Sequence, residues 1–217
     1  MSTALLPEGA RPGLHRVARW LATWLYRPAY RIRVRGKENV PKTGPVVLVA
    51  NHSSLIEPQL VFGATGRNSV FWVKNELYRG VLGTMLVAIG QLPLRRGEPD
   101  RVALLTAVRI LKAGGMIGVF PEGGRGSGDV ETAQQGAAWL VRSTGAVVLP
   151  VACRGTRRPE GSGRRFRPAV DVLIGRPHTV KVARGRAGLA EGTEDIRVLL
   201  ADLVAELDEQ RKRNGRG

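Results

Sequence analysis

Short runs of apolar, β-branched residues constrain the fold of this chain most strongly. Three of them, at 45–51, 116–120 and 146–152, carry no charge and have the length of strands buried on both faces. Helical patterns lie between them, at 100–114, which ends in two glycines, and at 134–144. Buried strands alternating with helices predict an α/β fold, a mixed and mostly parallel sheet flanked by helices. The 217 residues suit one such domain.

Weaker patterns supply the remaining elements. The expected strands lie at 31–36, 69–73, 91–94, 170–174 and 179–182, and the expected helices at 57–64, 78–90 and from about Thr193 onward. The longest uncharged run, 80–94, has fifteen residues. A membrane-spanning helix needs about 20, so we expect this run in the core.

The charge of the chain is concentrated in two flanks. Lys and Arg number 34 against 18 Asp and Glu, a formal net charge of +16. Residues 11–37 hold eight basic groups and no acid, and 154–186 hold ten basic groups against two acids, whereas 38–153 is nearly neutral. Such a surplus indicates a polyanionic partner, which charge alone does not identify as lipid or nucleic acid. With a single cysteine and no His/Cys cluster, we expect no disulfide, no metal and no cofactor.

An amphipathic helix is predicted over 14–27. Its apolar face gathers Leu14, Val17, Ala18, Leu21, Trp24 and Leu25, and its polar face Arg16, Arg19, Thr23 and Arg27, with Trp20 at the boundary. Apolar side chains with Trp on one face and arginines on the other are typical of a helix in an anionic membrane interface. An ordinary helix that covers the core is the alternative. We expect 1–30 to form an interfacial segment, 31–217 to form the domain, and no secretory signal to be present.

His52 is the leading candidate for chemistry, because it directly follows the buried strand 45–51. Reactive groups collect at strand ends in α/β sheets. Glu57, five residues later, can turn back to accept a hydrogen bond from one imidazole nitrogen, which leaves the other nitrogen as a base. A structural hydrogen bond is the alternative for this pair.

Two further segments offer groups for an anion. Residues 120–127 follow another buried strand and contain Glu122, Gly123 and Arg125 among several glycines. Glycines let backbone N–H groups approach an anion, and an arginine fork matches a phosphate. Arg95 and Arg96 follow the expected strand 91–94. Taken singly, the loop is also compatible with a plain turn and the arginine pair with a solvated face.

The order of these pieces carries a resemblance. The pieces are Asn51-His52-x4-Glu57, Gly90 to Leu94-Arg95-Arg96, Phe120-Pro121-Glu122-Gly123-x-Arg125, and Val147-Val148-Leu149-Pro150-Val151. Together, from about Tyr30 to Thr156, they resemble the glycerolipid acyltransferases, and most closely the bacterial 1-acyl-glycerol-3-phosphate acyltransferases. Two positions depart from the family pattern: Glu57 stands where Asp is usual, and Gly124 stands where Thr or Ser is usual.

The resemblance implies a reaction and roles for its residues. His52 would be the general base that deprotonates the free hydroxyl of lysophosphatidic acid, and Glu57 would orient it. The oxygen would attack acyl-CoA or an acyl-carrier protein directly and give phosphatidic acid. The glycerol phosphate would bind Arg96, Glu122, Gly123 and Arg125, with Arg95 in place of Arg96 if Arg96 points away. The protein would lie at the cytoplasmic face of the cell membrane, peripheral or monotopic.

Two other functions remain open from the sequence. One is acylation of a different lysophospholipid or a glycolipid. The other is a non-catalytic basic protein that binds membranes or nucleic acid through 154–186. That segment has only Phe166 as an aromatic residue, so it is poorly supplied for base stacking, and no nucleic-acid partner is expected.

Overall fold

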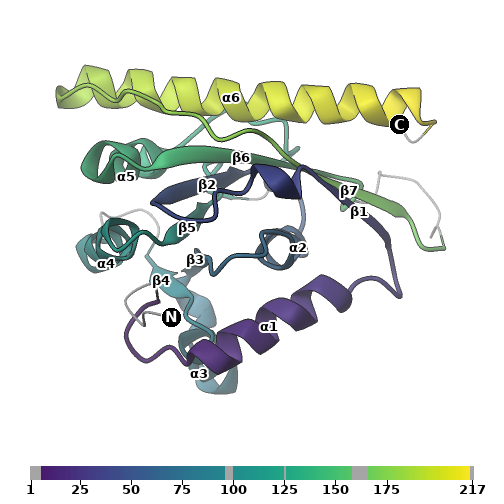
Figure 1. Ribbon diagram of the computed structural model, residues 1–217, viewed down its shortest axis with the longest axis horizontal. Helices are drawn as coiled ribbons and strands as arrows, with labels where there is room; N and C mark the ends of the chain where they lie inside the picture. The colour runs from purple at the N-terminus through teal and green to yellow at the C-terminus, as the bar shows by residue number, and fades with distance from the viewer. Residues whose placement is uncertain (1–5, 96–99, 125, 158–165, 216–217) are drawn as a thin grey trace.

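The fold is built on one twisted sheet (Figure 1), seen in a computed structural model that describes residues 6–95, 100–124, 126–157 and 166–215. The strands are β1 (Arg31–Arg35), β2 (Val46–Ala50), β3 (Val70–Lys74), β4 (Leu92–Leu94), β5 (Met116–Val119), β6 (Val147–Arg154) and β7 (Ala169–Ile174). The helices are α1 (Pro12–Trp24), α2 (Glu57–Ala64), α3 (Gly80–Ala88), α4 (Arg101–Lys112), α5 (Gly136–Thr144) and α6 (Gly185–Arg213).

The sheet is mixed and mostly parallel, as predicted. Its seven described strands have the order β1-β7-β6-β2-β5-β3-β4. β6, β2, β5, β3 and β4 run parallel to one another, whereas β7 is antiparallel to β6 and pairs in parallel with β1. The carboxyl ends of the three central strands β6, β2 and β5 therefore meet at one edge of the sheet, where ligands bind in α/β folds.

Both faces of the sheet are covered, which explains the uninterrupted apolar runs. Val47 and Val49 of β2 face a core built with α4, α5 and α6. Val46 and Leu48 face the other way, into a core shared with α2 and Ala22 of α1. Figure 1 shows α6 and α1 on opposite sides of the sheet. Strands buried on both faces have no polar alternation, so the sequence and the layers agree.

The C-terminal part corrects two expectations. Residues 179–182 are not a strand, and only His178 bridges to Val148. Helix α6 begins at Gly185, well before Thr193. Gly188 and Gly192 lie so close to Ala183 and Val182 that a Cβ on either glycine would clash. Tertiary packing thus supports a glycine-rich first part of α6 that helix propensity alone disfavours.

Candidate active site

Three central strands deliver the groups of the candidate site to one edge. His52 follows β2, Glu122 follows β5 and Thr156 follows β6. Buried Asn51 ties these loops together: its Nδ2 donates to the carbonyl oxygens of Gly128 (3.1 Å) and Cys153 (3.0 Å). Its Oδ1 accepts from the N–H of Cys153 at 2.7 Å. The loops are therefore fixed by buried hydrogen bonds before any substrate binds.

Glu57 lies at the centre of the site, fully buried at the first turn of α2. Its Oε2 lies 3.1 Å from Nδ1 of His52 and accepts from the N–H groups of Ser53 (2.6 Å) and Ser54 (3.0 Å). Its Oε1 accepts from the hydroxyls of Ser53 (2.7 Å) and Thr156 (2.6 Å). The carboxylate thus reaches back to two N–H groups of the segment between β2 and α2 and holds that segment in place.

Five donors keep this buried carboxyl ionised. Burial alone would raise the pKa of Glu57, but the hydrogen bonds from His52, Thr156 and the two serines together lower it. An ionised Glu57 accepts a hydrogen bond from Nδ1–H of His52, and this fixes the tautomer in which Nε2 carries the free lone pair. The site thus contains an oriented imidazole, nearly buried and packed against the Phe120 ring at 4.7 Å between centroids.

The loop after β5 approaches His52 through the backbone. Oε1 of Glu122 accepts from the N–H of His52 at 2.6 Å, and the N–H of Gly126 donates to the His52 carbonyl oxygen at 2.9 Å. Burial raises the pKa of Glu122, and the carboxylates of Glu57 and Asp129 act in the same direction. Gly123 has φ of 69°, and a Cβ there would clash with Gln134, so this turn requires glycine.

A small cavity of about 190 Å³ opens beside this loop. It is lined by Glu122, Gly124, Gly126, Ser127, Glu131 and Thr132. Among the residues that the structure describes, no group of His, Cys, Asp and Glu is arranged to hold a metal ion. The described groups of the site are an imidazole, a buried carboxylate and a glycine-rich loop.

Comparison with known proteins decides the family. Residues 31–154 match the family model described as Acyltransferase. The chain belongs to the acyltransferase family. Its relatives are named as enzymes of this class, so the chain is an acyltransferase.

Individual relatives are about 30% identical to this acyltransferase over the aligned residues. It is 28% identical over 184 residues to the 1-acyl-sn-glycerol-3-phosphate acyltransferase of Bacillus subtilis, covering 82% of this chain and 90% of that protein. It is 30% identical over 171 residues to a chloroplastic 1-acyl-sn-glycerol-3-phosphate acyltransferase of Arabidopsis thaliana, covering 75% of this chain and 48% of the plant protein. The chain thus spans about half of the plant relative and most of the bacterial one.

A solved structure is also similar. The crystal structure of the 1-acyl-sn-glycerophosphate acyltransferase of Thermotoga maritima superposes with a TM-score of 0.67 at 27% identity, covering 90% of this chain and 78% of that one. The likeness extends beyond the matched residues 31–154, since it covers nine tenths of this acyltransferase.

The structure brings together four of the six residues predicted for the site of this acyltransferase. His52 contacts Glu57 directly, and Glu122 and Gly123 lie in the loop bonded to the His52 backbone. The other two, Arg96 and Arg125, lie outside the described residues. Arg95 is exposed, and its backbone N–H donates to Asp100 at 3.2 Å.

Sequence reasoning missed two partners of Glu57, Ser53 and Thr156. Thr156 lies 99 positions from Glu57 in the chain, yet its buried hydroxyl donates to the carboxylate. The signal that points to it is its place just beyond β6, at the carboxyl edge that also holds His52. Aspartate is usual at this position in the family pattern, and the longer side chain of Glu57 is held here by hydrogen bonds from these two hydroxyls.

Proposed function

We propose that the protein is a 1-acylglycerol-3-phosphate O-acyltransferase, which moves an acyl group from acyl-CoA or an acyl-carrier protein to the free hydroxyl of lysophosphatidic acid. The product is phosphatidic acid, and the enzyme acts in phospholipid biosynthesis. The observation that carries the proposal is the buried pair of His52 and Glu57 beside the loop at Gly123, in a chain whose relatives bear this name.

The geometry supports a direct transfer without an acyl-enzyme. Nε2 of His52 accepts the proton of the acceptor hydroxyl while Nδ1–H remains bonded to Glu57. The hydroxyl oxygen forms a new C–O bond to the thioester carbonyl carbon, and the C–S bond then breaks. The leaving thiolate takes the proton from His52, which returns the imidazole to its starting state. The buried Cys153 plays no part, since burial raises its pKa far above the range of a thiolate nucleophile.

The acceptor phosphate is proposed to bind the loop after β5, with Arg96 and Arg125 as further partners. Backbone N–H groups next to Gly123, together with Arg96 and Arg125, supply donors of the right kind. A carboxylate repels a phosphate, so Glu122 would act by holding the backbone of His52. A different acceptor, another lysophospholipid or a glycolipid, is the second candidate, because Gly124 lacks the hydroxyl that the family usually presents here.

We further propose that 1–30 is an interfacial segment, that 31–217 is the catalytic domain, and that the protein works at the cytoplasmic face of an anionic membrane. The apolar face predicted for α1 supports this. Trp20 and Trp24 are 62% and 52% exposed, while His15 and Ala22 are the helix residues buried against the protein. Within the described ranges, none of the helices has the length and hydropathy to cross a bilayer. A peripheral or monotopic attachment is therefore the form we propose.

An acceptor screen tests the proposed function. Purified protein would receive one labelled acyl donor, first acyl-CoA and then acyl-carrier protein, with lysophosphatidic acid, lysophosphatidylcholine, lysophosphatidylglycerol or a glycolipid. We expect labelled product with lysophosphatidic acid, and none with a His52→Ala control. Product with a different acceptor only would replace this proposal by the second candidate.

A further inference from the structure

Helix α3 presents apolar side chains to the outside. It contains no charged residue, and Gly83 is its one buried position. Val81 is 79% exposed and Met85 56%, and Leu82 and Val87 are also exposed. This corrects the expectation that 80–94 lies in the core for the helical part of that run, whereas Gly90, Gln91 and Leu92 are buried as expected. The buried Gly83 packs so tightly on the backbone of Tyr78 that a Cβ there would clash.

Helices α3 and α1 are joined at one end. The N–H of Arg11, just before α1, donates to the carbonyl oxygen of Ala88 at 2.8 Å. Nδ1 of His15 lies 2.7 Å from the carbonyl oxygen of Ile89, and the His15 ring is fully buried edge-on to Phe62. These contacts place the exposed apolar residues of α3 beside the start of α1, and Figure 1 shows both helices on the side of the molecule opposite α6.

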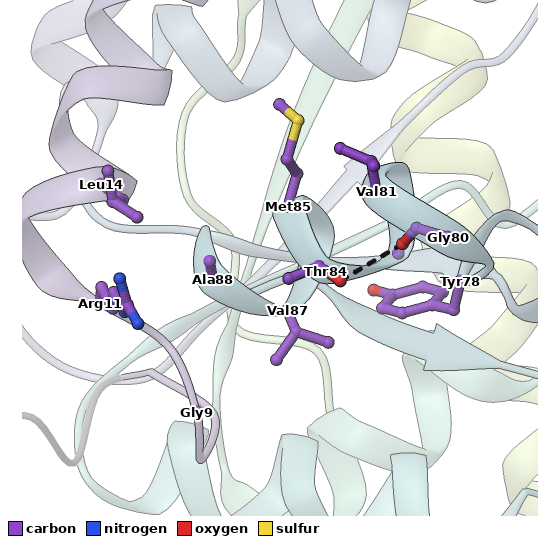
Figure 2. A pocket seen from close by; sticks show the side chains of 11 residues that line it. Gly9, Arg11, Leu14, Tyr78, Gly80, Val81, Thr84, Met85, Val87 and Ala88 are labelled. Atoms are coloured by element: carbon purple, nitrogen blue, oxygen red, sulfur yellow. Dashed lines mark hydrogen bonds between the residues drawn. The ribbon is translucent and has the colours of Figure 1, made fainter.

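The two helices border a large apolar recess of about 1130 Å³ (Figure 2). Leu14 of α1 lines it, together with Val81, Met85 and Val87 of α3. Thr84, the polar side chain of α3 in this recess, has its hydroxyl bonded to the carbonyl oxygen of Gly80 at 3.3 Å. The recess is thus continuous with the exposed apolar face of α1 and offers few hydrogen-bonding groups.

Basic residues predominate around this surface, although exposed Glu8 adjoins Gly9 and exposed Glu76 lies two positions before Tyr78, and both Gly9 and Tyr78 line the recess. Residues 9–37 and 77–95 contain no acidic residue, whereas Arg11, Arg16 and Arg79 are exposed at the helix ends and flank. An apolar centre with a predominantly basic border matches the apolar interior and anionic headgroups of a bilayer.

We propose that α3 is a second membrane-contacting element, and that α1 and α3 together enter the outer part of an anionic bilayer as one surface. The inference rests on the proposed membrane location and adds to it a segment of the catalytic domain. Burying one large apolar side chain contributes about a tenfold gain in affinity or more. A surface supplied by two helices therefore binds vesicles far more tightly than α1 alone, and it holds the catalytic domain against the membrane.

A single-thiol probe tests this directly, because Cys153 is the one cysteine of the chain and is fully buried. Met85→Cys, Leu25→Cys and Val102→Cys variants would each carry a polarity-sensitive fluorophore. Val102, on α4, is 77% exposed and serves as the matched control. Each protein would be titrated with vesicles of phosphatidylcholine alone and with added phosphatidylglycerol.

We expect the emission at positions 85 and 25 to shift to the blue on phosphatidylglycerol vesicles, and emission at position 102 to stay unchanged. A response at 25 without one at 85 would overturn the role of α3 and leave the membrane role of α1 intact. No emission shift at either position 85 or position 25 would overturn this inference and the proposed membrane location. Acyl transfer in the acceptor screen would not be affected by that result. A blue shift at position 85 that appears when the protein concentration is raised in the absence of vesicles would overturn the proposal, because it would indicate that this surface contacts a second copy of the chain.

The same inference is tested by affinity. A Val81→Ser/Met85→Ser double variant should bind phosphatidylglycerol vesicles at least about tenfold more weakly, and Val102→Ser should bind like the unchanged protein. Equal affinity of the double variant and the unchanged protein would overturn the proposal.

Discussion

The carboxyl edge of the sheet and the surface of α1 and α3 differ in which kind of side chain they bury and which they expose. At the carboxyl edge a charged group, Glu57, is fully buried, and all its hydrogen-bonding capacity is met by protein donors. On the surface of α1 and α3, large apolar side chains such as Trp20 and Val81 stand exposed. The polar groups of the first region are satisfied within the protein, whereas the second region leaves apolar side chains exposed, which we propose are covered by the membrane.

This difference separates what each region is expected to control. Changes at the carboxyl edge remove a partner from a buried network, so they should affect both the chemical step and the folding free energy. Changes on the exposed apolar surface remove little that holds the fold, so they should affect binding to the membrane with the fold intact.

The largest effect is expected from Glu57→Gln. The amide cannot accept from all the donors that now surround the carboxylate, and it no longer holds the His52 tautomer by charge. We expect transfer to fall by about 10³-fold, within the range that acid–base catalysis contributes, measured as thiol release with saturating donor.

The matched variant for this position is Glu57→Asp, which keeps the charge but shortens the side chain by one methylene. We expect it to retain more activity than Glu57→Gln. A Glu57→Gln protein as active as the unchanged enzyme would remove Glu57 from the mechanism.

The second effect concerns the exposed surface. Trp20→Ser/Trp24→Ser removes two large exposed apolar groups, each expected to contribute about tenfold or more to membrane affinity, so vesicle binding should weaken by about 100-fold. The free energy of unfolding should change by no more than about 0.5 kcal/mol per site. Denaturant unfolding and vesicle sedimentation of the same samples measure both. A large loss of stability with unchanged vesicle binding would show that α1 serves the core.

A smaller effect on the chemistry is expected from Thr156→Val, which removes one hydroxyl from Glu57 at nearly constant volume. A hydrogen bond to a charged group contributes about 1.5–3 kcal/mol, and transfer should fall by about tenfold. Its loss should raise the pKa of Glu57, so the acid limb of the pH–rate profile should move to higher pH. Thr156→Ser should have the same pH–rate profile as the unchanged protein. If Thr156→Val does not change the profile, Thr156 has a structural role only.

The smallest effect is the dependence of stability on pH. The pKa of Glu57 is lowered in the folded protein relative to an unfolded value of about 4.3. Its contribution to stability is therefore fully present above about pH 5 and is lost as the pH falls through the folded pKa. Unfolding free energies measured from pH 7 downward should show this loss, and Glu57→Gln should flatten the slope below about pH 5. An unchanged slope would contradict the ionised state of Glu57.

The sequence predicted the sheet well because its strands are buried on both faces. The uncharged runs at 45–51, 116–120 and 146–152 predict β2, β5 and β6. The pair of His52 and Glu57 could be predicted because it directly follows β2. Its hydrogen bond at 3.1 Å matches the predicted geometry. What the pattern left open was whether the apolar face of α1 covers the core. The structure shows the face of His15 and Ala22 packed and the face of Trp20 and Trp24 exposed.

The remaining differences come from contacts that local patterns do not contain. The hydroxyl of Thr156 reaches Glu57 only because β6 lies beside β2 in the sheet. In α6, Gly188 packs against Ala183, and in α3, Gly83 packs against Tyr78. In both helices a glycine permits a close approach that sequence patterns do not reveal, and hydropathy alone assigned α3 to the core.

The most direct test of the account is thiol release by the purified protein on phosphatidylglycerol vesicles that contain lysophosphatidic acid, with a long-chain acyl thioester as donor. We predict one phosphatidic acid formed for each thiol released, no release without lysophosphatidic acid, and a loss of about 10³-fold in a folded His52→Ala variant. Equal release by the unchanged protein and His52→Ala would contradict the account, as would thiol release without phosphatidic acid.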